Sequence, residues 1–247
     1  MGKEMIQVIT SFNQKYYDLI GKDSTESFLK YWPEHLKLTC YVEEFCLPEH
    51  ERIEQIDFSK LDPDYAKFQL EPDLNQSQKK FAKKAYSFMH ALKHSTADWI
   101  FWMDADVVTQ APVPVSVLED ILDPKCLSMY MGVTYTSDKS GNPGNWLVPE
   151  TGIFAVNTRH RKFKKFRKEY CRRYHERDYA DLRRFYDNDV FGAALNVCDT
   201  KVVDLCEGFL KPYKTPLPHT VMGQYLIHFK AKHSKAEYGQ ETADEDQ

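Results

Sequence analysis

Two aspartates separated by one residue, Asp104 and Asp106, are the side chains whose type and spacing most clearly permit chemistry. They directly follow the apolar run Trp99–Met103, which is too continuous for a half-exposed strand, so we expect a buried strand there. Side chains two residues apart on a strand point to the same side, and open α/β sheets bind their ligands at this carboxyl end. Other Asp-x-Asp pairs lack such a strand before them: Asp62/Asp64, Asp187/Asp189 and Asp244/Asp246.

A divalent cation is the natural partner of this carboxylate pair. Two adjacent carboxylates that are dehydrated and unpaired are strongly unfavourable. Mg²⁺ and Mn²⁺ favour oxygen ligands and commonly share their coordination shell with the phosphates of a bound ligand. The sequence therefore predicts a metal site at Asp104 and Asp106, and the alternative is a turn in which water solvates both carboxylates.

The elements that must position this pair alternate between strands and helices along the chain. Such alternation predicts an α/β fold. We expect turn residues at 11–14, an irregular surface insertion at 48–74 and a loop at 137–149. The expected strands span residues 6–10, 36–45, 99–103, 127–133, 152–156, 201–205 and 225–229. The expected helices span residues 24–31, 76–93, 115–122, 159–177 and 187–195.

The composition is that of a chain with a substantial core and no membrane segment. Of the 247 residues, 42% are hydrophobic, and no apolar run approaches the ~20 residues of a membrane span. The formal charge of -4 argues against a surface devoted to nucleic acid. The N-terminus shows no secretory signal, and scattered cysteines without a CxxC pair indicate reduced thiols. We therefore expect a cytoplasmic protein.

Two segments carry a strong local charge. From Arg159 to Arg177 the chain holds ten Lys or Arg residues against two Glu. This segment fits either a solvated helix face or a surface that attracts an anionic acceptor, such as a phosphorylated lipid, a polysaccharide or a nucleic acid. From Ala236 onward there are five acidic residues and no Lys or Arg. That composition predicts a single domain over residues 1–235 and a disordered acidic tail over 236–247.

Several motifs, in their order along the chain, resemble those of GT-A fold glycosyltransferases. The run from Trp99 to Val108 resembles the Asp-x-Asp strand of that family, and residues 8–13 resemble its first nucleotide-binding strand and turn. Asp187-Asn-Asp189 is similar to the Asp-Gln-Asp of glycogenin-like and lipopolysaccharide galactosyltransferase-like members. The remaining matches are Phe81-x-x-Lys84, Glu150-Thr-Gly-Ile-Phe-Ala-Val156 and His228-Phe-Lys-Ala-Lys232. Three positions depart from the residues common in the family: Glu150, Asn188 and Ala231.

The resemblance implies one GT-A-like domain. Its fold would be an open, twisted, mixed and mostly parallel sheet flanked by helices, with a Rossmann-like, nucleotide-binding N-terminal half. Its activity would be that of a metal-dependent glycosyltransferase of the hexosyltransferase type, using Mn²⁺ or Mg²⁺. The donor would be a nucleotide-sugar, expected to be UDP-linked, and the acceptor an unidentified hydroxyl. The C-terminal motif resembles that of members that retain the anomeric configuration.

The resemblance also implies roles for individual residues. The implied metal ligands are Asp104, Asp106 and His228. The implied contacts to the base and ribose of the donor are Thr10, Phe12 and Asn13. The other implied donor contacts are Asp104, facing the ribose, and Gly152 and Lys232. Lys84 would contact the donor phosphate or an active-site carboxylate. The residues implied to face the reacting centre are Glu150, Asp187, Asn188 and Asp189.

Several of these residues also have an ordinary structural explanation. Asp187 and Asp189 could cap a helix that begins near Val190. Lys84 borders an apolar helical stripe and could extend its ammonium group into solvent. A strand histidine such as His228 is more commonly packed or hydrogen-bonded than bound to a metal.

Two other functions fit parts of the sequence. Residues 100–108 match the signature of haloacid dehalogenase-like phosphatases, in which Asp104 would be the nucleophile and Asp106 the acid–base group. That signature usually opens its chain, whereas a strand and a helix precede it here, and it gives His228 no role. A third possibility is a non-enzymatic module that binds polyanions through the basic helix, with binding that falls with salt and ignores metal.

Overall fold

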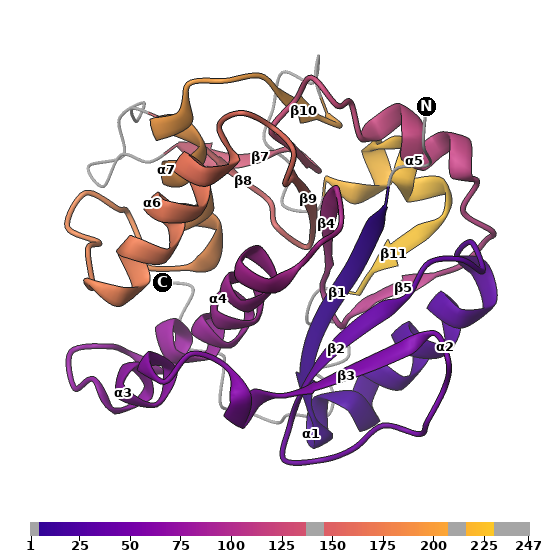
Figure 1. Ribbon diagram of the computed structural model, residues 1–247, viewed down its shortest axis with the longest axis horizontal. Helices are drawn as coiled ribbons and strands as arrows, with labels where there is room; N and C mark the ends of the chain where they lie inside the picture. The colour runs from indigo at the N-terminus through magenta and orange to yellow at the C-terminus, as the bar shows by residue number, and fades with distance from the viewer. Residues whose placement is uncertain (1–4, 137–145, 207–215, 230–247) are drawn as a thin grey trace.

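The computed structural model describes residues 5–136, 146–206 and 216–229. Its central seven-stranded sheet consists of β1 (Ile6–Asn13), β2 (Leu38–Glu43), β3 (Ile53–Asp57), β4 (Trp99–Met103), β6 (Ser128–Tyr130), β9 (Ile153–Asn157) and β10 (Val202–Asp204). Their order across the sheet is β10-β6-β9-β4-β1-β2-β3 (Figure 1). All pairings are parallel except the two made by β9, which runs antiparallel to β6 and β4. The sheet is therefore mixed and mostly parallel, as predicted.

Two short ribbons supplement the sheet. In one, β5 (Val107–Thr109) pairs antiparallel with β11 (Leu226–His228), and in the other, β7 (Val133–Thr136) pairs antiparallel with β8 (Leu147–Pro149). The first ribbon sets His228 opposite Val107. It therefore brings a residue from near the end of the chain beside the turn that follows β4.

Helices cover both faces of the sheet (Figure 1). The α-helices are α1 (Gln14–Tyr16), α2 (Lys22–Tyr31), α3 (Asp64–Leu70), α4 (Gln76–His94), α5 (Val115–Ile121), α6 (Phe163–His175) and α7 (Asp187–Cys198). Short 3-10 helices are η2 (Phe58–Lys60), η3 (Leu217–His219) and η4 (Val221–Gln224), and η1 (Tyr17–Gly21) is a π-helix. One hydrophobic core lies between the sheet and α4, α6 and α7, and a second lies between the sheet, α2 and α5.

Strand β4 is buried on both faces, which explains its continuous apolar sequence. Ile100 and Trp102 belong to the core beneath α4, whereas Trp99, Phe101 and Met103 belong to the core beneath α2, and none is more than 1% exposed. Each large side chain buried in this way contributes about 1.5–3 kcal/mol to the free energy of unfolding. The end of β4 is therefore a well-anchored point from which functional side chains can project.

A cap fixes the first residue of α4, and an apolar stripe fixes the face that the helix buries. Asn75 and Gln78 form a capping box, in which each side chain accepts a hydrogen bond of 2.8 Å from the other residue's amide. Phe88 and Leu92 are buried on the stripe that the periodicity predicted. Together the cap and the stripe fix the direction in which Lys84 leaves the helix.

Three expectations about irregular segments are wrong. Residues 11–13 continue β1, because Ser11, Phe12 and Asn13 stay paired with β2. The segment 48–74 contains β3 and α3, whose sequences are polar because β3 lies at the sheet edge and α3 buries only Phe68. The end of the expected loop 137–149 forms β8 instead.

Other boundaries differ by a few residues or cannot be compared. The basic helix is shorter than expected, since α6 begins at Phe163 and not at Arg159. Lys232 and the segment 236–247 lie outside the described residues.

All six cysteines are unpaired, and four of them are buried. Within the described ranges, no helix combines the length and the apolar character needed to cross a membrane.

Candidate active site

Asp104 and Asp106 lie in the turn between β4 and β5. The Val107 amide donates to the Asp104 carbonyl at 3.0 Å, and the Asp104 amide donates to the Gly152 carbonyl at 2.8 Å. The sequence analysis expected the alternating side chains of a strand to align the two carboxylates, and this expectation is wrong. The turn brings them together instead, with side chains 27% and 15% exposed.

His228 joins the two aspartates in a compact group. One ligand atom from each of the three side chains lies within 4.8 Å of the others. The Nε2 atom of His228 is 3.1 Å from Oδ1 of Asp106 and 3.8 Å from Oδ2 of Asp104. Strand β11 delivers this histidine because it pairs with β5, which follows the aspartate turn directly. The three predicted metal ligands therefore converge.

The charges in this group influence one another's ionisation. Burial alone would lower the pKa of His228, but the hydrogen bond and negative charge of Asp106 raise it overall. Burial opposes the ionisation of Asp106, yet the hydrogen bonds from His228 and from Tyr16, which the sequence analysis did not single out, lower its pKa. Burial raises the pKa of Asp104 despite the nearby ammonium group of Lys84. A further positive charge would favour the ionised form of both aspartates.

The chemistry of this group fits a hard divalent cation. Two carboxylates offer oxygen ligands, and a neutral imidazole offers a nitrogen ligand. Within the described residues, Nδ1 of His228 makes no hydrogen bond, and it lies 4.0 Å from Oε1 of Glu150. Metal-binding histidines commonly have a carboxylate behind the second ring nitrogen. Asp104, Asp106 and His228 are therefore suited to hold the Mn²⁺ or Mg²⁺ that the resemblance implies.

Gly152 allows His228 to approach the aspartates. It precedes β9, whose antiparallel pairing with β4 sets Ile153 beside Met103 at the same edge of the sheet. A methyl group on Gly152 would lie 2.3 Å from Cε1 and 2.6 Å from Nδ1 of His228. Such distances are far below van der Waals contact, so only glycine is compatible with this position of the imidazole. The donor contact expected of Gly152 stays a prediction.

The variant Gly152→Ala should lose metal affinity. The new methyl group must displace the imidazole of His228, and even indirect disturbance of a metal ligand typically costs about 10–100-fold in affinity. Titration calorimetry with Mn²⁺ measures this loss. Gly192→Ala is a matched control, because its methyl group would lie 2.8 Å from the Leu147 carbonyl oxygen. Equal Mn²⁺ affinity in both variants would contradict the role given to Gly152.

Lys84 is enclosed by carboxylates of the candidate site. Its Nζ atom is 2.8 Å from Oδ1 of Asp104 and 3.1 Å from Oδ2 of Asp187, and it donates to the Thr151 carbonyl at 2.5 Å. Burial alone would lower the pKa of Lys84, but the two carboxylates raise it, so the side chain stays protonated. The side chain is only 12% exposed. The explanation by extension into solvent is therefore wrong, and Lys84 links α4, the β4 turn and α7.

Two side chains beyond those singled out from the sequence extend this network. The indole Nε1 of Trp102 donates to Oδ1 of Asp104 at 2.6 Å. The hydroxyl of Thr151 donates to Oδ2 of Asp187 at 2.6 Å. Trp102 precedes Asp104 by two residues, and side chains two residues apart on a strand point to the same side. The sequence could therefore have indicated the contact between them. Nothing in the sequence pairs Thr151 with Asp187.

The aspartates near residue 188 lie inside α7. The helix begins at Asp187 and not near Val190, and the preceding residue, Tyr186, makes no side-chain capping bond. The capping explanation for Asp187 and Asp189 is therefore wrong, although carboxylates in a first turn still interact favourably with the helix dipole. Asn188 is half-buried, and its side chain accepts a bond of 3.0 Å from the Asp189 amide.

Asp189 has contacts of its own. It is 1% exposed, accepts a hydrogen bond from the Tyr135 hydroxyl, and lies 4.0 Å from Nε of Arg184. Its Oδ1 atom has no hydrogen-bond partner within the described residues. Burial raises the pKa of Asp189 to about 6, which Tyr135 and Arg184 offset only in part. At neutral pH the ionised Asp189 is therefore an unfavourable buried charge.

The variant Asp189→Asn should gain stability relative to the wild type as pH rises. The folded-state pKa is raised above the unfolded value, so ionisation of Asp189 destabilises the fold from about pH 4 upward and is complete above pH 6. Between pH 4 and pH 7 the variant should gain about 2 kcal/mol in free energy of unfolding over the wild type. Urea denaturation of both proteins at the two pH values measures this, and a pH-independent difference would contradict the assignment.

The residues expected to contact the base and ribose have different environments. Phe12 packs against Tyr17 and Phe45, with ring centroids 5.3 and 6.0 Å away, and Asn13 caps α1. These structural roles account for both side chains. Thr10 is 1% exposed, and its hydroxyl has no hydrogen-bond partner within the described residues. Contact of all three with a donor stays a prediction.

Comparisons with known proteins identify the fold. No protein-family model matches the sequence, and a search of curated proteins finds no match. The galactosyltransferase LgtC, solved in complex with donor and acceptor sugar analogs, matches with a TM-score of 0.52 and 15% identity over 90% of this chain and 86% of that chain. The mannosyltransferase Ktr4p from S. cerevisiae matches with a TM-score of 0.53 and 13% identity over 79% of this chain and 66% of that chain. The chain therefore has the GT-A glycosyltransferase fold that the motifs implied, and nothing in these matches supports the phosphatase alternative.

Proposed function

We propose that this protein is a metal-dependent glycosyltransferase that transfers a sugar from a UDP-linked nucleotide-sugar to a hydroxyl acceptor. The observation that carries the proposal is the convergence of Asp104, Asp106 and His228 within 4.8 Å at the carboxyl end of β4. Open α/β sheets bind their ligands at this end. The fold shared with LgtC and Ktr4p supports the same conclusion.

The residues present match what the departure of a nucleoside diphosphate requires. Negative charge accumulates on the departing diphosphate, and a bound Mn²⁺ or Mg²⁺ would neutralise it as a Lewis acid. Asp104, Asp106 and His228 would hold that cation. Lys84, which stays protonated between Asp104 and Asp187, adds a fixed positive charge beside it.

The hydrogen bonds of Asp187 and Glu150 favour a retaining reaction over an inverting one that uses either of them as its base. An inverting reaction needs a base that is free to take the proton of the acceptor hydroxyl. Asp187 already accepts from Lys84 and Thr151, and Glu150 accepts from the Gly152 amide at 2.9 Å. Both carboxylates are thus engaged with the protein, and in our proposal they stabilise positive charge near the sugar instead of removing a proton.

Donor binding should be visible as metal-dependent thermal stabilisation. A ligand present at a hundred times its Kd stabilises a protein by about 2.7 kcal/mol, which for a domain of this size raises Tm by about 5–10 °C. We expect at least one nucleotide-sugar, and UDP itself, to produce such a shift with Mn²⁺ and a much smaller one with EDTA. A panel of nucleotide-sugars that produces no shift, or equal shifts with and without metal, would argue against the proposed function.

A further inference from the structure

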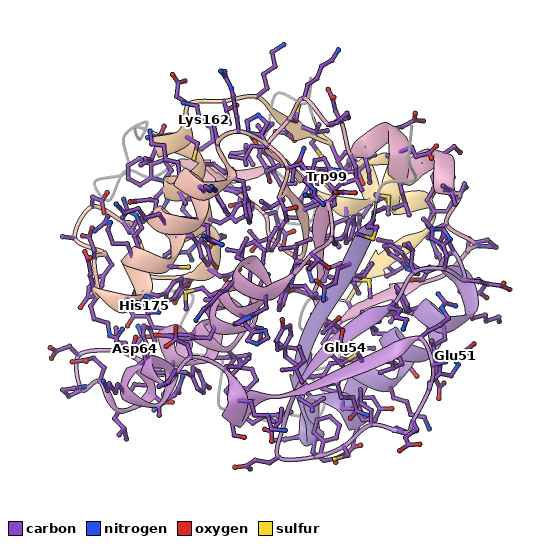
Figure 2. The ribbon with its side chains drawn as sticks, viewed as in Figure 1. Glu51, Glu54, Asp64, Trp99, Lys162 and His175 are labelled. Atoms are coloured by element: carbon purple, nitrogen blue, oxygen red, sulfur yellow. The ribbon has the colours of Figure 1, made fainter. Side chains whose placement is uncertain are left out.

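A second concave site lies between α4, α6 and the segment 60–63. Its volume is about 770 Å³, and its floor includes the buried Met89. Among the described residues that line it, Asp62 is the only acid, and it is paired with His175 at 2.9 Å. Figure 2 shows His175 at one end of α6 and Lys162 at the other. The lysine and arginine side chains that line this basic groove are Lys60, Lys93, Lys164, Arg167 and Lys168.

Among the described residues, positive charges on α6 are neutralised near its C-terminal end but not nearer its start. Arg172 and Arg173 are tied to carboxylates, with Glu169 2.9 Å from each of them. The ammonium groups of Lys164 and Lys168, by contrast, form no hydrogen bond or ion pair with any described residue and are exposed. The basic segment is therefore not uniformly solvated, because carboxylates neutralise its C-terminal arginines and leave the positive charge of these two lysines unneutralised within the described residues.

The two unneutralised lysines of α6 oppose further positive charge across the groove. Lys164 and Lys168 are one helical turn apart, an arrangement that is unfavourable for like charges. Lys93 lies opposite them on α4, exposed and likewise without a partner among described residues. The rings of His90 and His94 lie beside it, tilted by 33° to each other, with centroids 4.5 Å apart. Converging cations of this kind are stabilised when an anion binds between them.

The groove is separate from the candidate active site. Both involve α4, but Lys84 and Lys93 are nine residues apart, which is about 14 Å along the axis and half a turn around it. Lys84 lies among the carboxylates near β4, and Lys93 lies in the groove. A ligand in the groove therefore does not contact Asp104 or Asp106, and binding there does not depend on the proposed function.

We propose that this groove is a binding site for a compact multivalent anion, a ligand that carries two or more phosphate groups. Its concave shape favours a ligand enclosed by both helices over a flat membrane surface. Apart from the histidines, no aromatic side chain among the described residues lines it, and nucleic-acid bases need such platforms for stacking. Phosphates spaced over one molecule would bridge Lys93 on α4 to Lys164 and Lys168 on α6.

Calorimetry with inositol hexakisphosphate and with inorganic triphosphate tests the site in the full-length chain, with EDTA present so that no metal contributes. Orthophosphate should bind at least about tenfold more weakly than either probe, because it cannot bridge the two helices. The double variant Lys164→Glu/Lys168→Glu should weaken binding by at least about tenfold. The matched control Lys162→Glu/Lys165→Glu changes the net charge of the same helix equally, outside the groove, and should bind within about threefold of wild type.

Three outcomes would overturn the site. Equal losses in the two double variants would show general attraction to a basic surface. Unchanged probe binding in Lys164→Glu/Lys168→Glu would place the anion outside the groove. Tight binding of a single-stranded RNA, or of vesicles containing phosphatidylinositol bisphosphate, that Lys164→Glu/Lys168→Glu abolishes while the free probes fail to bind would assign the positive charge to another partner. Vesicle binding that the groove variant abolishes, together with binding of the free probes, would support the site and identify a lipid headgroup as one source of the anion.

Discussion

The variant Asp106→Asn should lose metal-dependent donor binding and sugar transfer by at least about a hundredfold. Residues that only support a metal ligand typically contribute about 10–100-fold to affinity or activity, so removal of a direct ligand should cost no less. Asp106 is the carboxylate closest to His228, at 3.1 Å, and the hydrogen bonds from His228 and Tyr16 lower its pKa. Asparagine preserves the size of the side chain while removing the charge that a divalent cation requires. Titration calorimetry with UDP and Mn²⁺ measures the loss.

Asp62→Asn is the appropriate control for that experiment. Asp62 also belongs to an Asp-x-Asp sequence, but its partner is His175 at the end of α6 and not the metal-ligand group. Its Mn²⁺-dependent UDP binding, taken as the difference between titrations with Mn²⁺ and with EDTA, should equal that of the wild type, because the groove that Asp62 lines binds without metal. If Asp106→Asn bound as tightly as Asp62→Asn, the assignment of Asp106 as a metal ligand would be wrong.

The variant Lys84→Met should be the most destabilising single substitution in the site. Methionine leaves Asp104 and Asp187 buried without their common counter-charge, and breaking a buried ion pair in this way costs about 3–5 kcal/mol. Urea denaturation should therefore show a large decrease in the free energy of unfolding. The double variant Lys84→Met/Asp187→Asn should recover part of it, because one of the two unpaired charges is then gone.

The neighbouring Lys83 provides a matched comparison on the same helix. It pairs with Glu43 at 2.5 Å, but its side chain is 34% exposed, and such pairs contribute about 0–1 kcal/mol. Lys83→Met should therefore be nearly neutral. Equal destabilisation by the two methionine variants would mean that Lys84 acts through general packing on α4 and not through the active-site carboxylates.

The sequence was most informative where burial dictated it. Strand β4 has to be apolar at every position because both of its faces are covered, so its location and its end at Met103 could be read directly. The same holds for α4, whose apolar stripe predicted the orientation of Lys84 at its border. The sequence was least informative at the sheet edge, where β3 is half-exposed and its residues resemble those of a loop.

The candidate site was only partly predictable because it depends on long-range pairing. Local sequence located Asp104 and Asp106, but the position of His228 beside them follows from the pairing of β11 with β5, which no local pattern encodes. The same limit applies to Tyr16 and Thr151, whose contacts with the aspartates come from separate segments. Family resemblance supplied His228 because it carries long-range information that a single sequence lacks.

Release of the nucleoside diphosphate from a panel of nucleotide-sugars tests the central proposal most directly. The assay compares wild type and Asp106→Asn, each with Mn²⁺ and with EDTA, and needs no knowledge of the acceptor because water can replace it slowly. We expect Mn²⁺-dependent release of the diphosphate from at least one nucleotide-sugar by the wild type, and none above background by Asp106→Asn. Absence of release from every donor, or release that is unchanged by EDTA or by the Asp106 substitution, would contradict the proposed function.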